Sequence, residues 1–140
     1  MKVLFICGDN VGRSQAAEAL FNKYAKKSTA WSCAGKPTWT KERDISNIEK
    51  EMPDVHDIVV IMKEDYGLNI SKKVSKPFNK EMVAKSDRVI VMCDPKDCPR
   101  IKDAEYWDTP RLSLYDREGK REIIKGIEAK TRDLIKALGE

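Results

Sequence analysis

Residues 2–14 read KVLFICGDNVGRS, and no other stretch of the chain says as much about the fold. It opens with a continuous apolar run from Val3 to Cys7, which is typical of a strand buried on both faces of a parallel sheet. Beyond Ser14, apolar residues recur at helical spacing as far as Tyr24. The stretch therefore predicts a strand, a tight loop and a helix.

The loop between that strand and helix brings a thiol and a guanidinium together. Backbone N–H groups of such a loop can form an anion nest, and the helix dipole adds positive potential, so the thiolate form of Cys7 is favoured as a nucleophile. Arg13 can hold two oxygens of a tetrahedral anion, and glycines at 8 and 12 permit the backbone angles of a tight loop. The alternative is an inert buried thiol and a surface cation. We expect an oxyanion site formed by Gly8, Asp9, Asn10, Val11, Gly12, Arg13 and Ser14.

The rest of the chain continues the alternation of strands and helices. A weakly alternating run at 29–34 and a continuous one at 87–92 predict two strands, and a short strand is predicted at 104–107. Helices are predicted at 53–67, at 78–85 and in the C-terminal segment up to Gly139, whereas 36–52 has no clear pattern. This order predicts an α/β fold with a parallel sheet, whose ligands bind beyond the carboxyl ends of the strands.

Composition limits the classes of function. The chain has 140 residues, with 27 Lys+Arg against 23 Asp+Glu and a net charge of +4, which suits one domain over residues 1–140. Its longest apolar runs are far shorter than the ~18 residues of a membrane span, so we expect no membrane partner. Basic and acidic residues are interspersed, which argues against nucleic acid and fits a small anionic ligand. We expect a cytoplasmic protein, and a monomer.

The four cysteines are Cys7, Cys33, Cys93 and Cys98. They are too few for a disulfide scaffold in a chain of this length, and they lack the paired spacing of a zinc site, so we expect no metal. Cys93 closes the 87–92 strand as Cys7 closes the first, which puts both thiols at one edge of the sheet. Cys33 is interpreted as a small buried hydrophobic residue.

At these residues the sequence resembles the low-molecular-weight protein tyrosine phosphatases and the thioredoxin-coupled arsenate reductases. Both families use a Cys-x5-Arg-Ser loop after the first strand, and segments 16–20, 62–64 and 67–71 are also similar to theirs. Segment 87–93 is similar to the strand that carries the second redox cysteine in the reductases. The resemblance implies a three-layer sandwich, in which a four-stranded parallel sheet carries helices on both faces. It implies no bound cofactor.

Cys93 and Cys98 favour the reductase branch, since reducing arsenate requires electrons that thiols supply as they become a disulfide. The resemblance implies that Cys7 attacks arsenic, that Cys93 then attacks Cys7 as arsenite leaves, and that Cys98 attacks Cys93. A thioredoxin-like donor would reduce the resulting disulfide. One alternative is a tyrosine phosphatase or small phosphomonoesterase that forms a phosphocysteine on Cys7, and another is a non-catalytic oxyanion or redox sensor.

Two departures from the family pattern concern carboxylates. Asp9 puts a negative charge in the loop, and we expect it to point outward, towards solvent or a cation. The family's general acid is an Asp-Pro that follows a Trp, and here the match is broken. Asp108 is slightly favoured over Asp116 as the acid, and either can be a solvated loop residue or a helix cap instead.

Overall fold

Four parallel strands form the central sheet of the computed structural model, which describes residues 1–140. The strands are β1 (Lys2–Cys7), β2 (Thr29–Ala34), β5 (Arg88–Val91) and β6 (Glu105–Tyr106), in the order β2-β1-β5-β6. β1 lies in the centre, where it pairs along its whole length with β2 and from Val3 to Ile6 with β5. The predicted four-stranded parallel sheet is confirmed.

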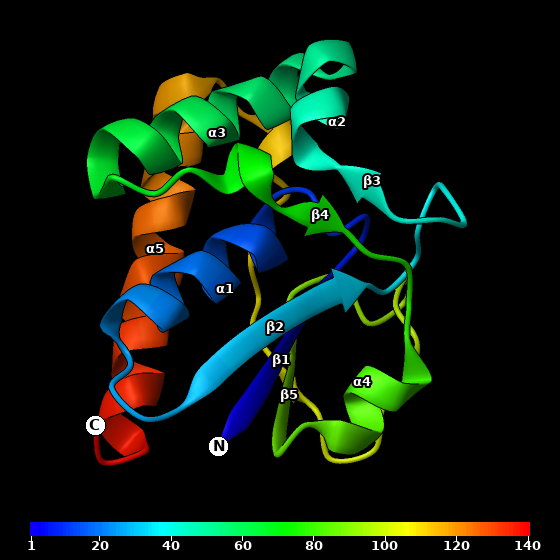
Figure 1. Cartoon of the computed structure of the whole chain (residues 1–140), viewed down its shortest axis with the longest axis vertical. Helices are drawn as coiled ribbons and strands as arrows, with labels where there is room; N and C mark the ends of the chain where they lie inside the picture. Colours follow the sequence, from blue (N-terminus) through cyan, green and yellow to red (C-terminus); the bar gives the residue numbers. More distant parts are fainter.

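The side chains of β1 alternate between two cores because successive residues of a strand point to opposite faces. Val3 and Phe5 belong to the larger core, together with apolar residues of α1 (Arg13–Tyr24) and α5 (Arg117–Ala137). Leu4 and Ile6 belong to a smaller core with Met82 of α4 (Lys80–Lys85). Figure 1 shows α1 and α5 on one side of the sheet and α4 on the other. Helices on both faces confirm the three-layer prediction.

Two helices and a small two-stranded sheet lie at one end of this sandwich, at the top of Figure 1. They are β3 (Arg43–Asp44), α2 (Ile45–Glu51), α3 (Pro53–Tyr66) and β4 (Val74–Ser75), with the 3-10 turn η1 (Ile70–Lys72) between α3 and β4. β3 and β4 pair antiparallel. Two of these elements, β3 and α2, lie within residues 36–52, for which the sequence showed no clear pattern.

The ends of the helices follow local chemistry. α3 begins with Pro53, which suits a first helical turn, and ends at Gly67 in the left-handed conformation (φ 68°), as predicted. α4 begins at residue 80 and not at 78, because the side chain of Asn79 accepts hydrogen bonds from two backbone N–H groups and caps the helix. No helix is both long enough and apolar enough to cross a membrane.

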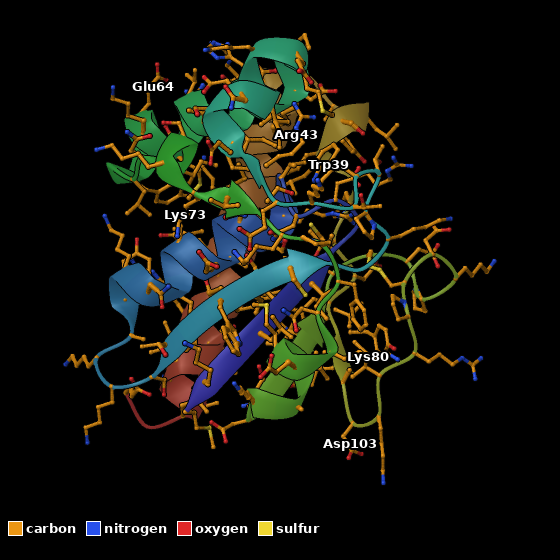
Figure 2. All side chains as sticks on the ribbon, turned by 45° about the vertical axis from the view of Figure 1, so that its right-hand side comes forward. Trp39, Arg43, Glu64, Lys73, Lys80 and Asp103 are labelled. Atoms are coloured by element: carbon orange, nitrogen blue, oxygen red, sulfur yellow. A yellow bond between two sulfur atoms is a disulfide. The ribbon has the colours of Figure 1, made fainter.

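Trp39 holds the segment before β3 in place. The guanidinium of Arg43 lies 5.1 Å from the ring centroid of Trp39, and both residues are marked in Figure 2. The indole N–H of Trp39 donates to Ser75 Oγ, which in turn donates to the backbone oxygen of Asp9. The small sheet of β3 and β4 is thereby joined to the loop that follows β1.

Candidate active site

The carboxyl ends of three strands meet at one cleft of about 860 Å³. Cys7 ends β1, Cys93 follows β5, and Trp107 and Asp108 follow β6; all four line the cleft. Gly8, Asp9, Val11, Gly12 and Arg13 line it as well, so most of the predicted oxyanion loop faces the same space. Asn10 and Ser14 are fully buried behind the loop instead.

Ser14 supports the sulfur of Cys7 directly. Its Oγ lies 2.9 Å from Cys7 Sγ, and its backbone N–H points at the same sulfur from 3.5 Å. Asn10 Nδ2 donates to Ser14 Oγ at 2.8 Å, and an amide nitrogen can only donate. The single hydroxyl proton of Ser14 is therefore free to donate to Cys7 Sγ, which stabilises a thiolate there.

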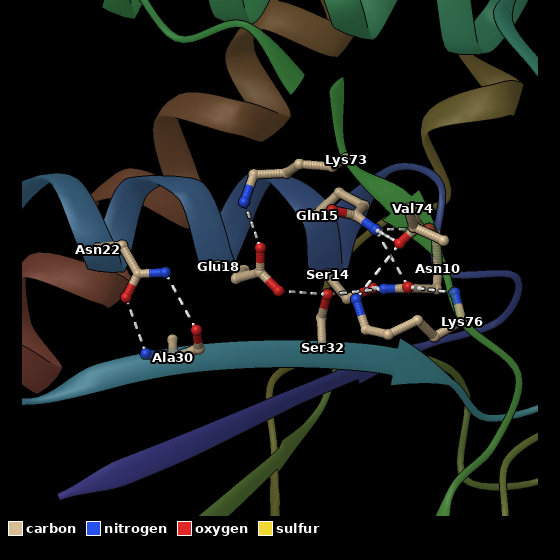
Figure 3. A network of polar contacts seen from close by, with 10 residues as sticks. All are labelled: Asn10, Ser14, Gln15, Glu18, Asn22, Ala30, Ser32, Lys73, Val74 and Lys76. Carbon is tan, nitrogen blue, oxygen red and sulfur yellow. Dashed lines mark hydrogen bonds and ion pairs between the residues drawn. The ribbon is translucent and has the colours of Figure 1, made fainter. Parts of the chain in front are cut away.

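Behind Ser14 the hydrogen bonds continue as a chain to a buried ion pair (Figure 3). The second proton of Asn10 Nδ2 goes to Ser32 Oγ at 2.9 Å, and Ser32 donates to Glu18 Oε1 at 3.0 Å. Glu18 is only 6% exposed, and the ammonium of Lys73 neutralises it. We name this chain of Lys73, Glu18, Ser32, Asn10 and Ser14 the support network.

Gln15 holds the loop from the other side of Asn10. Its Nε2 lies within 3.1 Å of three acceptors, which are the backbone oxygens of Asn10 and Val74 and the side-chain oxygen of Asn10. This orientation leaves Gln15 Oε1 buried with no partner, because turning the amide round would set its oxygen against all three acceptors. Gln15 thus fixes the position of Asn10, while its own side-chain oxygen stays without a hydrogen bond.

Asn10, and not a glycine, takes the left-handed conformation of the loop (φ 58°), which corrects the expected role of the glycines. A Cβ atom on Gly8 would meet nothing within 4 Å, and its φ is not positive. Gly12 is needed for packing, since a Cβ there would lie 3.0 Å from both Ile58 Cδ1 and Leu112 Cδ1. The short polar side chain of Asn10 tolerates the conformation and is held in it by the support network.

Positive potential converges on the mouth of the loop. The backbone N–H groups of residues 8–12 donate no hydrogen bond inside the protein, and α1 begins immediately after them. Arg13 Nη1 donates to the backbone oxygens of Met92 and Thr109 at 2.8 and 3.0 Å, which fixes its guanidinium between the segments after β5 and β6. Its Nε and Nη2 make no such bond and remain for an oxyanion.

Asp9 is held by Thr38. Its Oδ1 accepts hydrogen bonds from the backbone N–H and the hydroxyl of Thr38, at 2.7 and 2.9 Å. The expectation of a side chain turned to solvent or a cation is met in part: Asp9 is half-exposed, but its partner is a neutral threonine. The two donors stabilise the carboxylate and fix its position, although they leave its negative charge in place.

Cys93 and Cys98 form a disulfide, with their Cα atoms 6.2 Å apart. Both are buried, at 7% and 8% exposure, and the sulfur of Cys98 sits against Gly35, where a Cβ atom would come within 2.7 Å of it. Cys33 is fully buried, and burial raises the pKa of its thiol to about 11, so it is an inert thiol as interpreted from the sequence.

The structure separates the two candidate acids. Asp108 is exposed and lines the cleft beside Trp107. Asp116 caps α5, since its Oδ1 accepts from the N–H of Gly119 at 2.8 Å, and it does not line the cleft. Of the two carboxylates, only that of Asp108 therefore lines the cleft, and its role as the acid stays a prediction.

Sequence reasoning missed Glu18, Ser32, Lys73, Gln15 and Thr38. One signal was present for Glu18, because it interrupts an otherwise apolar stretch of α1 and a carboxylate in such a place must find a partner. The partners come from distant segments, β2 and the 70–76 region, and nothing local announces them.

The fold and the cleft define an α/β protein with a cysteine and an arginine at the two ends of the loop between β1 and α1. The chain belongs to the low molecular weight phosphotyrosine protein phosphatase family, whose family model matches residues 2–140. A low molecular weight protein tyrosine phosphatase from T. tengcongensis has the same fold, with a TM-score of 0.76 at 20% identity over 98% of this chain and 99% of that one.

Two solved arsenate reductases are also similar. The thioredoxin-dependent enzyme of Corynebacterium glutamicum is 30% identical, with a TM-score of 0.69, and the match covers 99% of this chain and 61% of that one. The arsenate reductase of Archaeoglobus fulgidus is 26% identical, with a TM-score of 0.72, over 99% of both chains.

Proposed function

We propose that this protein is an arsenate reductase, in which Cys7 binds arsenic and Cys93 and Cys98 supply two electrons. The observation that carries the proposal is the disulfide between Cys93 and Cys98, since Cys93 lines the cleft of Cys7. A hydrolase of this fold needs only one reactive thiol, whereas a reductase needs a pair that can be oxidised. The similarity to two arsenate reductases supports the same choice.

The first step forms a bond between sulfur and arsenic. Arsenate binds to the loop N–H groups and to the free edge of Arg13, and the Cys7 thiolate displaces one oxygen, which leaves as water after protonation. Ser14 holds the thiolate before the attack through its hydroxyl. Asp108 lies in the cleft as a proton source for the departing oxygen.

The second and third steps move the electrons. The Cys93 thiolate attacks Cys7 Sγ, the sulfur–arsenic bond breaks, and its electron pair stays on arsenic, which leaves as arsenite. Cys98 then attacks Cys93, Cys7 departs as thiolate, and the disulfide of the structure is formed. Two thiols lose two electrons and arsenic gains two, so an external dithiol such as thioredoxin must restore the pair.

An assay with arsenate, thioredoxin, thioredoxin reductase and NADPH tests the proposal. We expect arsenate-dependent oxidation of NADPH, its loss in Cys7→Ser and Cys93→Ser, and at most one turnover in Cys98→Ser. Cys33→Ala is the matched control, because this thiol is buried outside the cleft and should not affect turnover. If Cys98→Ser turns over as fast as the wild type, the relay is wrong.

The exposed carboxylate of Asp108 in the cleft favours a phosphomonoesterase as the second candidate. In that reaction Cys7 would take the phosphoryl group while Asp108 protonates the leaving oxygen and then activates water. Hydrolysis of p-nitrophenyl phosphate that needs Cys7 and Asp108, and survives the loss of Cys93 and Cys98, would decide for this candidate. Oxyanion binding without any turnover would contradict both enzymatic functions.

A further inference from the structure

The loop that joins β5 to β6 carries a second hollow, on the side away from Cys7. The hollow has a volume of about 530 Å³. Three cations and three other residues line it, and none of them is acidic: Lys96, Arg100, Lys102, Pro95, Ile101 and Tyr106. Pro95 and Tyr106 also line the cleft, so they form the ridge between the two spaces.

The charges of this loop are sorted between its two sides. Asp94 and Asp97 line the cleft, whereas the three cations line the hollow. Lys96, Arg100 and Lys102 make no ion pair, although many other basic side chains of this protein do. Unpaired cations around one hollow create a positive surface that fits a negatively charged partner.

The disulfide carried by this loop is almost fully buried. Its two cysteines are 7% and 8% exposed, and only Cys93 lines the cleft, so a protein donor needs the loop to move before its thiolate can approach the sulfurs. The backbone hydrogen bonds of the loop are internal, from Asp97 and Cys98 to Asp94 and from Ala104 to Ile101, so it can shift without breaking the sheet. A partner can favour the open loop only by binding it more tightly than the closed one.

We propose that the hollow is the docking surface of the protein that reduces the disulfide, and that this donor surrounds its dithiol with acidic side chains. The proposal rests on the arsenate reductase function given above. Acidic side chains of the donor pair with Lys96, Arg100 and Lys102, and its apolar surface covers Ile101 and Tyr106. Figure 2 shows the loop at the edge of the molecule, with the exposed Asp103 at its tip, outside the set that lines the hollow.

Docking leads to a balanced exchange of thiols and disulfides. One donor thiolate attacks a sulfur of the Cys93–Cys98 bond, that bond breaks, and the other cysteine leaves as a thiolate. The second donor thiol then attacks the mixed disulfide and releases the reduced protein. The donor ends as a disulfide and has given up two electrons.

The test uses the oxidised protein and needs no arsenate. The protein is oxidised with diamide, mixed with an acidic thioredoxin in its reduced form, and the loss of the disulfide is timed by alkylation and mass spectrometry. The variant K96E/R100E/K102E reverses the hollow, and K63E/K72E/K136E is the control, because it makes the same change in net charge at exposed lysines without ion pairs on other elements. Dithiothreitol serves as a donor that does not dock.

We expect the rate with thioredoxin to fall at least about tenfold in the hollow variant and to stay within about twofold in the control. Rates with dithiothreitol should be equal in all three proteins, and added salt should slow thioredoxin only with the wild type and the control. An unchanged rate in the hollow variant overturns the proposal, as does an equal loss in the control. The binding of an acidic phosphopeptide to the same proteins is measured as well. If the hollow variant loses phosphopeptide binding but keeps its rate with thioredoxin, the hollow serves a substrate and the proposal is overturned.

The two proposals fail in different ways. If thioredoxin reduces the disulfide in a charge-dependent manner but arsenate is never turned over, docking stands and the arsenate reductase function falls. If arsenate is reduced at equal rates by the wild type and the hollow variant, the function stands and docking falls.

Discussion

At the scale of single residues, Asn10 does what two glycines were expected to do. It adopts the left-handed conformation of the loop and at the same time directs the hydroxyl proton of Ser14 towards Cys7. A glycine would permit the same backbone but would supply no donor, and Ser14 could then turn its proton elsewhere. The contact of Ser14 with the Cys7 sulfur is therefore set by Asn10, which lies three positions after Cys7 and is fully buried.

Replacing Ser14 by alanine should make the thiolate form of Cys7 less stable. The variant loses one hydrogen bond to a charged sulfur, and such bonds contribute about 1.5–3 kcal/mol, so we expect Cys7 to be alkylated by iodoacetamide roughly tenfold more slowly at neutral pH. Mass spectrometry of the Cys7 peptide measures the rate. Ser71→Ala is the control, because the Ser71 hydroxyl in η1 donates to Asn69 and not to Cys7. An equal rate in Ser14→Ala would show that the contact does not act on the thiolate.

Gly35→Ala should oppose the Cys93–Cys98 disulfide. A new Cβ atom would lie 2.7 Å from the sulfur of Cys98, which cannot move while it is bonded but can rotate away when it is reduced. Overpacking of this kind costs about 1–3 kcal/mol, so the thiol–disulfide equilibrium against glutathione should shift by about tenfold towards the reduced form. Gly126→Ala is the control, because a Cβ there meets nothing within 4 Å. Equal equilibria in the two variants would contradict the steric assignment.

The sequence located the reactive residues more easily than their supports. Cys7 and Cys93 stand at the carboxyl ends of apolar runs, and parallel strands bring such ends together, while Arg13 opens the helix that follows the loop after Cys7. Lys73 and Thr38 gave no comparable signal, because their partners are set by how distant segments pack and not by any spacing along the chain. The same holds for Arg13, whose anchoring to the oxygens of Met92 and Thr109 depends on the whole sheet.

At the scale of elements, the helices and strands with a clear apolar pattern in the sequence were the ones that could be predicted. β1 and β5 are continuous apolar runs because both of their faces are buried, and α3 has an apolar stripe between Pro53 and Gly67. β3 and β4 have two residues each, too few for any alternation to be visible. α2 buries only Ile45 and Ile48, so its seven residues show no helical repeat.

Lys120→Met tests how α5 is attached to α3. The side chain of Lys120 is 2% exposed, and its ammonium contacts Asp57, Asp54 and the backbone oxygen of Tyr115. Burial alone would lower the pKa of Lys120, but hydrogen bonds to the two carboxylates raise it above its usual value. Methionine fills the space but leaves the carbonyl and carboxylates without this donor, so we expect a loss of about 1–3 kcal/mol in the free energy of unfolding.

Urea denaturation at neutral pH measures this loss. Lys125→Met is the control, since Lys125 is exposed and pairs only with Glu122 one turn away, a contact that contributes about 0.5 kcal/mol or less. If the two variants are equally stable, the buried ammonium does not stabilise the contact between α5 and α3.

At the scale of the whole molecule, the cleft and the contacts that hold the two chain ends together lie at opposite ends of the sheet. The cleft lies at the carboxyl ends of the strands, while the two ends of the chain meet at the amino ends, at the bottom of Figure 1. There Glu140 accepts hydrogen bonds from the N–H groups of Lys26, Lys27 and Ser28 and from the hydroxyl of Ser28. The amino group of Met1 also donates to Ser28 Oγ, so one carboxylate joins α5 to the turn between α1 and β2.

Glu140→Gln should therefore change stability with pH and leave the chemistry alone. The bonds from Ser28, and then those from the neighbouring N–H groups, lower the pKa of Glu140 from 4.5 to about 2 in the folded protein. A carboxylate whose pKa is lower when folded stabilises the protein above pH 4.5, and this contribution is lost as the pH falls from 4.5 towards 2. Urea denaturation should show wild type more stable than the variant at pH 7, with the gap closing towards pH 2.

The distance of Glu140 from the cleft makes a second readout decisive. At pH 7, under conditions in which both proteins remain folded, the variant should bind arsenate and react with iodoacetamide at Cys7 as the wild type does, because no residue of the support network contacts Glu140. A gap in stability that is the same at pH 7 and pH 2 would mean that the charge of Glu140 contributes nothing and that the variant differs only by the loss of one acceptor oxygen. A loss of reactivity at Cys7 would mean instead that the two ends of the sheet are coupled.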